Sequence, residues 1–227
     1  MNDSQKSPLY LLDGYSLIYR SYFAFINRPL LNSKGFNTSA IFGFFRSIAA
    51  LFESRNPEYF CVVLDSVTPT FRHEMYPEYK ANREKAPDDL HAQVPVIQEV
   101  LKAMNIRSVR MNGYEADDII AVLAKMCEAE GRECYIITGD KDLLQLVGNG
   151  VKMMKPDKGE YQILDTPAVK EVWGVEPCQI IEYLALTGDS ADNVPGVKGI
   201  GPKTAVKLLN EFETLDNIYA NLESFSA

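Results

Sequence analysis

The sequence has few of the residues that build disulfide frameworks and zinc sites. It contains four cysteines and two histidines among 227 residues, and no pair of cysteines has Cys-x-x-Cys spacing. Cysteines that lie mostly among apolar neighbours, as these do, are typical of reduced thiols in the core of a cytosolic protein. We therefore expect a cytoplasmic protein without disulfides or structural zinc.

Long hydrophobic runs are missing as well. No stretch approaches the roughly 18 uninterrupted apolar residues of a membrane span, and the first eight residues are polar rather than a charged-then-apolar leader. We expect no membrane partner. With 46% hydrophobic and 24% charged residues, the composition is that of a soluble globular protein. A chain of this length can form one large domain or a domain with an appendage.

Three common catalytic signatures are absent. No Gly-x-Ser-x-Gly elbow offers a serine nucleophile, and the residues after Asp13 exclude the Asp-x-Asp-x-Thr motif of many phosphatases. A glycine-rich segment near residue 200 differs from a phosphate-binding P-loop, because Pro202 interrupts it and no strand precedes it. The two histidines, His73 and His91, lie in or near a basic segment instead of beside a nucleophile.

Short apolar runs alternate with amphipathic segments along most of the chain. Three runs stop abruptly at an aspartate, and these are residues 9–13, 59–65 and 133–140. Apolar residues recur at three- and four-residue spacing in segments 38–53, 94–104 and 119–130, which predicts helices. We predict a further strand at 106–110 and a terminal hairpin formed by 151–155 and 161–164, joined through 157–159. This alternation predicts an α/β fold with a mainly parallel sheet and helices on both faces.

Acidic residues gather where such a sheet binds ligands. Ligands of open parallel sheets collect at the carboxyl ends of the strands, and each of the three runs ends there in an aspartate. A further acidic cluster opens the helix after the strand at 106–110, and a last pair lies three residues apart, a spacing that places both on one face of a helical turn. The nine candidates are Asp13, Asp65, Glu115, Asp117, Asp118, Asp140, Asp142, Asp189 and Asp192.

Each of these acids alone is more often a turn residue or a helix N-cap. Seven or more carboxylates at one sheet edge repel one another and raise each other's pKa values, unless cations neutralise them. Oxygen ligands favour Mg²⁺ or Mn²⁺, and two such ions about 4 Å apart suit phosphoryl chemistry. Setting the nine acids aside changes the formal charge from −8 to +1, so net charge does not exclude a nucleic-acid partner.

Segment 68–89 does not fit the α/β pattern. It is rich in proline, and its basic residues alternate with aromatic ones. This combination can grip a single strand by base stacking and phosphate attraction, although a solvated loop explains it about equally well. Because the segment holds little aliphatic surface, we expect it to be mobile without DNA.

Segment 189–209 is a glycine-rich turn that feeds a helix. Its spacing fits a helix–hairpin–helix turn, in which the amides of Gly199 and Gly201 and the following helix N-terminus face phosphate oxygens. Lys198, Lys203 and Lys207 add positive charge, and such contacts hold a duplex backbone without reading its sequence. A tight interhelical turn without ligand is the alternative interpretation.

These segments resemble the 5′-nuclease domain of bacterial DNA polymerase I and the wider flap endonuclease family. The resemblance covers nearly the whole chain, and three of its motifs are highly specific in combination. The matching stretches are LLDGYSLIYRSYFA, FRHEMYPEYKANR, GYEADDIIAVLA, TGDKDLLQLV and LTGDSADNVPGVKGIGPKTA.

The resemblance implies a PIN-like nuclease core at residues 1–185 with a helical arch at about 68–92. It also implies a helix–three-turn–helix DNA-binding module at 186–227, truncated relative to the family. The implied enzyme is a structure-specific 5′ nuclease, both 5′–3′ exonuclease and flap endonuclease, that acts in DNA replication and repair. Its implied partners are DNA with a free 5′ end or flap and, in the full-length protein, a covalently linked polymerase domain.

The resemblance also assigns roles to residues. All nine carboxylates match metal-site positions that hold two Mg²⁺ ions, for which Mn²⁺ would substitute, and a monovalent cation is implied at the helix–three-turn–helix turn. Lys80 and Arg83 match the basic arch residues that act on the scissile phosphate. The expected DNA-binding residues are Arg72, Tyr79, Lys198, Gly199, Gly201, Lys203 and Thr204.

Two other functions remain as alternatives at this point. A PIN-type ribonuclease would share the acidic core, although the arch and the glycine–lysine hairpin favour a DNA junction. A DNA-junction binder without catalysis is the second alternative, but such a protein gains nothing from nine acids that face a phosphate backbone.

Overall fold

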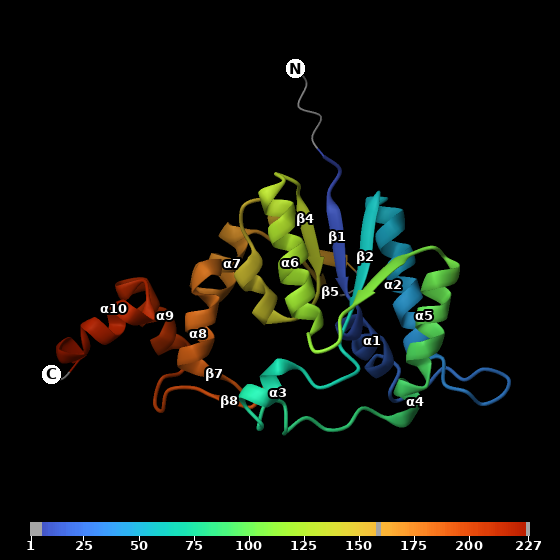
Figure 1. Cartoon of the computed structure of the whole chain (residues 1–227), viewed down its shortest axis with the longest axis horizontal. Coiled ribbons are helices and arrows are strands. Elements are labelled where there is room, and N and C mark those ends of the chain that lie inside the picture. The colour runs from blue at the N-terminus through green and yellow to red at the C-terminus, as the bar shows by residue number, and fades with distance from the viewer. Residues whose placement is uncertain (1–5, 158–159, 226–227) are drawn as a thin grey trace, which may run out of the picture.

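The computed structural model describes residues 6–157 and 160–225 (Figure 1). It contains a six-stranded sheet in the order β3-β2-β1-β4-β5-β6, parallel except for the last strand. The strands are β1 (Leu9–Asp13), β2 (Tyr59–Leu64), β3 (Arg107–Arg110), β4 (Cys134–Ile137), β5 (Val151–Asp157) and β6 (Glu160–Leu164). The mainly parallel sheet and the terminal hairpin are confirmed. The turn of that hairpin at 158–159 and the first five residues of the polar start lie outside the described residues.

Alternation along the strands divides the core into two layers. Leu11, Val63 and Ile136 point to one face and pack on α6 (Ala116–Ala129). The residues between them, such as Leu12 and Val62, point to the other face. There they pack on α1 (Gly14–Phe23), α2 (Ser39–Arg55) and α5 (Gln93–Ala103). The sheet is therefore covered on both faces, which explains why its strands read as continuous apolar runs.

A close approach fixes the start of α1 directly after β1. A Cβ atom on Gly14 would lie 2.6 Å from the Leu64 side chain and 2.8 Å from the Val63 carbonyl oxygen, so a larger residue would push α1 away from β2. Asp13, the last residue of β1, caps this helix by accepting a hydrogen bond from the Ser16 amide at 3.1 Å. The sequence thus places Asp13 rigidly at the carboxyl end of the sheet.

The C-terminal elements extend from the β6 edge of the sheet, and the last two helices lie at the lower left of Figure 1. They are α7 (Thr166–Trp173), α8 (Ile180–Thr187), the two-stranded hairpin β7 (Gly188–Asp189) and β8 (Val194–Pro195), α9 (Pro202–Phe212) and α10 (Leu215–Ala220). One apolar cluster runs from Met153 and Leu164 in the sheet through Ile180 to Leu209. These elements therefore share a core with the sheet edge.

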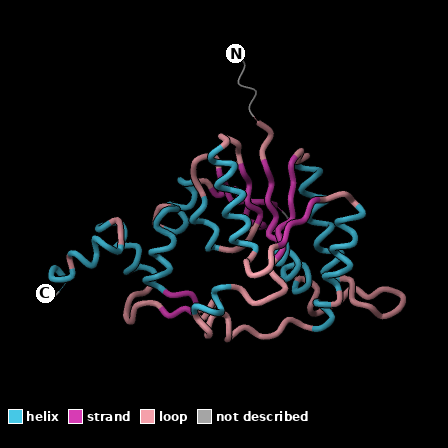
Figure 2. The backbone as a smooth tube through the Cα atoms, in the orientation of Figure 1, coloured by secondary structure: helices cyan, strands magenta, loops and turns pink. Residues whose placement is uncertain are grey.

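The chain between β2 and α5 passes below the carboxyl ends of the strands, next to the β7–β8 hairpin (Figure 2). Only two short helices interrupt it, α3 (Phe71–Met75) and α4 (Asp88–His91). We call residues 68–92 the arch segment. Three of the four cysteines are buried as expected, whereas Cys178 is exposed. No helix in the described part of the chain is long and apolar enough to cross a membrane.

Candidate active site

A cavity of about 950 Å³ opens at the carboxyl ends of β1, β2 and β4. Five of the nine predicted acids line it, and we call them the cavity group: Asp13, Asp65, Glu115, Asp117 and Asp140. Lys80 and Arg83 of the arch segment line the same cavity. The expectation that strand-end carboxylates converge thus describes this part of the structure well.

Hydrogen bonds to backbone amides orient the cavity group. Asp65 accepts from the Ala116 amide at 2.8 Å, which joins the end of β2 to the start of α6. Asp140 caps the 3₁₀ helix η1 (Lys141–Leu146) by accepting from the Asp142 amide at 3.0 Å. Asp13 accepts a second hydrogen bond from the Thr138 hydroxyl at 2.8 Å. The local preference of aspartate for cap positions therefore presents these carboxylates at one edge.

Glu115 of the cavity group pairs with Lys80 and Arg72, whereas the other four carboxylates have no cationic partner in the part of the chain that the structure describes. Burial, aided by the charges of Asp65 and Asp140, raises the pKa of Asp13 to about 6 against the opposing hydrogen bonds. Burial and neighbouring aspartates raise the pKa of Asp117 to about 8. Such a site favours a bound cation, because a cation would restore the charged forms.

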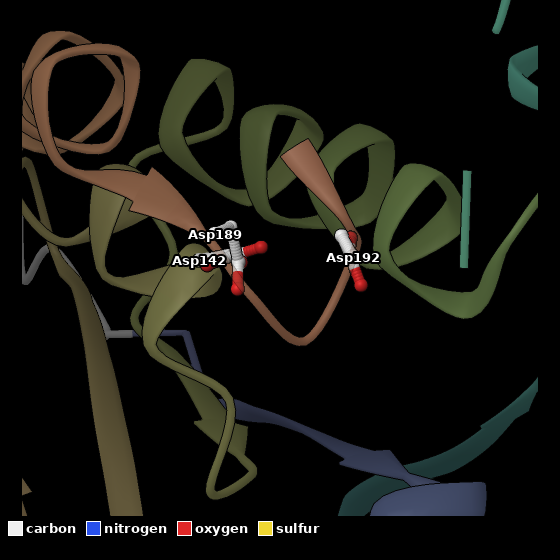
Figure 3. A group of neighbouring side chains, drawn as sticks. All are labelled: Asp142, Asp189 and Asp192. Carbon is white, nitrogen blue, oxygen red and sulfur yellow. The ribbon is translucent and has the colours of Figure 1, made fainter. Parts of the chain in front are cut away.

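A second aspartate group lies beside this cavity. It consists of Asp142, Asp189 and Asp192, whose carboxylate oxygens approach within 4.8 Å of one another (Figure 3). Among the described residues, no other three His, Cys, Asp or Glu side chains come this close. Glu115 and Asp117 line both the large cavity and a smaller one of about 210 Å³ that touches Asp142 and Asp192. The two groups are therefore neighbours, with Glu115 and Asp117 between them.

The helical turn predicted for Asp189 and Asp192 is wrong. Asp189 ends β7, and Asp192 lies in the turn that leads to β8. Gly188 at φ +77° and Asn193 at φ +59° adopt left-handed conformations that belong to a tight hairpin rather than a helix. The hairpin turn brings the two aspartates together where the sequence had suggested helical spacing.

Cationic side chains occupy the second aspartate group. The Lys141 ammonium donates to Asp189 at 2.6 Å and to Asp142 at 3.1 Å, and Arg83 donates to Asp192 at 2.6 Å. Burial opposes ionisation of Asp189, yet the hydrogen bonds from Lys141 and backbone amides hold its pKa below the usual value. Burial also works to lower the pKa of Lys141, but the two carboxylates outweigh it and raise that pKa.

Asp118 is the ninth acid, and it is committed to an arginine. Arg72 donates two hydrogen bonds to its carboxylate, both of 2.8 Å, in a bidentate pair. Burial disfavours the charged form, but this arginine and the Glu115 amide nevertheless lower the pKa of Asp118. The arginine that we expected to contact DNA is thus engaged inside the protein.

Tyr79 is another residue with a different environment from the one expected. It is only 8% exposed, and its hydroxyl donates to Glu115 at 2.9 Å and to Asp192 at 3.0 Å. Its ring is therefore not available for base stacking in this conformation. Burial and the two carboxylates raise the pKa of Tyr79, so the hydroxyl stays a donor. The neighbouring Lys80 adopts a left-handed backbone at φ +57° and pairs with Glu115 at 3.0 Å.

The glycine turn, residues 196–201, has open space at its last two glycines, whereas Gly196 packs closely against Thr187 and Gly188. A Cβ atom on Gly199 or Gly201 would meet nothing within 4 Å, and Gly199 has a φ of +88°. Gly201 caps the N-terminus of α9, and Lys198, Lys203 and Thr204 are exposed around it. The predicted DNA-binding residues of this turn are therefore accessible together at a helix start.

Sequence reasoning missed Thr138 and Lys141. Thr138 is buried and holds Asp13, and its only signal was its place two residues before Asp140. Lys141 stands between two predicted metal ligands in the stretch Asp140-Lys141-Asp142, which was the available signal.

Comparisons with known proteins agree with this arrangement. Residues 8–174 match the family described as "5'-3' exonuclease, N-terminal resolvase-like domain", and residues 175–227 match "5'-3' exonuclease, C-terminal SAM fold". The chain is 51% identical to DNA polymerase I of Treponema pallidum over 97% of its own length, but it spans only 22% of that protein. It is 46% identical to a 5'-3' exonuclease of Aquifex aeolicus, with 96% of this chain and 74% of the relative covered.

Solved structures show the same fold at lower sequence identity. The bacteriophage T5 flap endonuclease in a pseudo-enzyme-product complex with DNA and metal ions has a TM-score of 0.78 at 23% identity, with 95% of this chain and 79% of that chain covered. Flap endonuclease-1 from Methanococcus jannaschii has a TM-score of 0.61 at 18% identity, with 95% and 74% covered. The family matches span the chain from residue 8 to 227, and on that ground it belongs to the 5′–3′ exonuclease family.

Proposed function

We propose that this chain is a structure-specific 5′ nuclease that hydrolyses DNA phosphodiester bonds as a 5′–3′ exonuclease and flap endonuclease in replication and repair. The observation that carries the proposal is the cavity group, whose four unpaired carboxylates share one cavity with Lys80 and Arg83. Carboxylates that have no cationic partner would bind divalent ions, and the basic residues in the same cavity would bind the phosphate of a DNA strand.

The residues present fit two divalent ions, Mg²⁺ with Mn²⁺ as a substitute, because all the unpaired ligands are hard oxygens. Such ions lower the pKa of an attacking water and stabilise the leaving oxygen. The proposed ligands are the cavity group, the second aspartate group and Asp118, which Arg72 would have to share or release. Raised pKa values at Asp13 and Asp117 support this assignment, since a bound cation would stabilise the ionised carboxylates against burial and mutual repulsion.

Lys80 and Arg83 are proposed to bind the scissile phosphate. Both line the cavity, and in this conformation both also pair with proposed metal ligands, Glu115 and Asp192. A phosphate between the arch segment and the cavity floor would compete for these cations. The two side chains would then offset negative charge that develops on the phosphoryl oxygens.

The module at residues 186–227 is proposed to hold the duplex beside a nuclease core at 1–185. The open glycine turn and the exposed Lys198, Lys203 and Thr204 support phosphate contacts there. We place the implied monovalent cation at the same turn. Arg72 and Tyr79 would contact DNA only after leaving Asp118, Glu115 and Asp192.

The chain spans only 22% and 24% of two DNA polymerase I relatives. We therefore propose that a polymerase domain is linked to it in the full-length, cytoplasmic protein. The chain also spans 74% of an exonuclease relative, so the nuclease activity is proposed for the chain by itself.

The testing experiment compares cleavage of 5′-flap, nicked, blunt and closed single-stranded circular DNA with Mg²⁺ and with EDTA. We expect Mg²⁺-dependent cutting of the flap and no cutting of the circle. Asp117→Asn should abolish cutting, and Asp157→Asn, at an exposed aspartate that ends β5, is the matched control. A preference for single-stranded RNA would favour the PIN-type ribonuclease, and flap binding without any cutting would favour the junction binder.

A further inference from the structure

Lys141 pairs with two carboxylates of the second aspartate group. Its ammonium lies between two aspartates from different elements, 2.6 Å from the Oδ2 atom of Asp189 and 3.1 Å from the Oδ1 atom of Asp142. Two-thirds of the side chain is buried. The ammonium therefore stands in the space between two of the three carboxylates that could share one ion.

No other cation serves these two carboxylates. Among the described residues, every ion pair of Asp142 and Asp189 is made with Lys141. The third member of the group, Asp192, has its own partners in Arg83 and Lys80 of the arch segment. Lys141 alone thus offsets the repulsion between Asp142 and Asp189, which come from η1 and from β7.

The position of Lys141 also faces the other site. Lys141 is also one of the residues that line the 950 Å³ cavity, together with the cavity group and the arch cations. An ammonium that leaves Asp142 and Asp189 therefore has this cavity beside it. There it would join Lys80 and Arg83 on the side of the cavity where we place the phosphate.

We propose that Lys141 is an internal counter-cation that a divalent ion displaces from Asp142 and Asp189, and that the displaced ammonium then binds the substrate phosphate. This inference rests on the proposed function. Without metal, Lys141 keeps the second aspartate group assembled. With metal, two positive charges replace one between the carboxylates, and like charges drive the ammonium outward. Metal occupancy and phosphate binding are thereby coupled through one side chain.

The first test measures binding of Mn²⁺ to the protein without DNA. The electron paramagnetic resonance signal of the free ion gives the amount that is not bound. Replacing Lys141 with the similarly shaped but uncharged methionine removes the competitor. In Lys141→Met, one class of Mn²⁺-binding sites should gain affinity by at least about fivefold, given the strength of charge interactions over a few ångströms at a protein surface. Lys125→Met is the matched control, because Lys125 is exposed and pairs with Glu128 away from both groups, and it should change affinity less than about twofold.

A double variant locates the effect. In Asp189→Asn the affected class loses one ligand, so adding Lys141→Met should produce little further tightening. Unchanged or weaker Mn²⁺ affinity in Lys141→Met overturns the inference while leaving the proposed nuclease intact. Failure of the unaltered protein to bind Mn²⁺ at all would instead overturn the metal-dependent function itself.

A measurement on the unaltered protein is independent of how the variants fold. The acylation rate of Lys141 by an amine-reactive reagent is followed by mass spectrometry with and without Ca²⁺. If Ca²⁺ displaces the ammonium, saturating Ca²⁺ should raise the acylation rate of Lys141 about tenfold and leave the acylation rate of Lys125 unchanged. An equal rate at Lys141 in both conditions means that the ion does not displace the ammonium, and the inference fails.

Discussion

The hydroxyl of Tyr79 donates a hydrogen bond of 3.0 Å to the carboxylate of Asp192 across 113 residues of sequence. It is one of seven hydrogen bonds that dock the arch segment on the turn between β7 and β8. Among them, the Lys80 amide donates to the Asp192 carbonyl at 3.0 Å, which holds Lys80 in its left-handed conformation. The middle of the arch segment thus contacts this turn through polar groups, whereas Leu90 near its end packs in the core. Mobility of the segment without DNA stays a prediction.

Docking of the arch segment should depend on two asparagines outside the proposed active site. Asn82 donates to the Ser190 carbonyl at 2.7 Å, and Asn193 donates to the Glu78 carbonyl at 2.8 Å. Combining Asn82→Ala with Asn193→Ala removes two hydrogen bonds worth about 1 kcal/mol each. The Lys80 amide should then exchange its hydrogen at least about tenfold faster, as measured by mass spectrometry. Equal exchange in the double variant and in an exposed control, Asn149→Ala, would show that these bonds do not hold the arch segment.

Catalysis should be separable from flap binding at Asp140. Asn can replace Asp as the cap of η1, so Asp140→Asn should preserve the fold and remove only charge. We expect single-turnover cleavage to fall by about a thousandfold, because the carboxylate acts through metal in the transition state. Flap affinity measured with Ca²⁺ should change little. Cleavage at the rate of the unaltered protein, with an unchanged melting temperature, would remove Asp140 from the proposed ligands.

Stability without metal should fall as pH rises from about 4 toward 8. The pKa values of Asp13 and Asp117 are raised in the folded protein to about 6 and about 8, so the folded state binds more protons than the unfolded state in this window. Each group therefore destabilises the fold as it ionises. Thermal melting should show a decline of a few degrees that Asp117→Asn reduces. A melting temperature that rises over this window would contradict the raised pKa values.

Addition of Mg²⁺ should reverse this trend. A divalent ion binds the ionised carboxylates, so binding releases protons at pH 6 and fewer at pH 9. We expect Mg²⁺ to raise the melting temperature more at pH 8 than at pH 5, where protons compete for the same oxygens. Calorimetry in two buffers of different ionisation enthalpy measures the released protons. The absence of proton release at pH 6 would argue against ligation by Asp13 and Asp117.

The glycine turn should hold duplex DNA without taking part in cleavage. In Gly201→Val the added side chain points into open space, so the fold should persist while an approaching phosphate is pushed away. Lys203→Ala should lower the slope of log affinity against log salt by about one unit. Both effects should appear on long duplex arms and vanish on arms too short to reach the turn. Equal losses on both arm lengths would remove the role of duplex anchor.

Much of the fold could be predicted because local patterns agree with tertiary structure in the sheet. The run that ends at Asp13 is a strand over its whole length, since apolar side chains fill both faces of a covered parallel sheet. The convergence of Asp13, Asp65 and Asp140 follows from the same rule about strand ends.

The parts that sequence could not predict depend on contacts between distant segments. The spacing of Asp189 and Asp192 fits a helical turn as well as a hairpin, and left-handed backbone at Gly188 and Asn193 decides for the hairpin. The composition of the arch segment suggested exposed aromatic side chains. Tyr79 is buried instead, because its hydroxyl donates hydrogen bonds to carboxylates of two other segments. Lys141 shows the same limit, because its partner Asp189 lies on a different element.

The central claim is that these carboxylates hold divalent ions for hydrolysis of DNA. Anomalous diffraction from crystals grown with Mn²⁺ tests it most directly, because it locates the ion independently of any assumed chemistry. We predict anomalous peaks within about 2 to 2.5 Å of carboxylate oxygens. One peak should lie in the cavity lined by Asp13, Asp65, Asp117 and Asp140, and another beside Asp142 and Asp189 with the Lys141 ammonium moved away. Crystals saturated with Mn²⁺ that show no peak at either group would contradict the account.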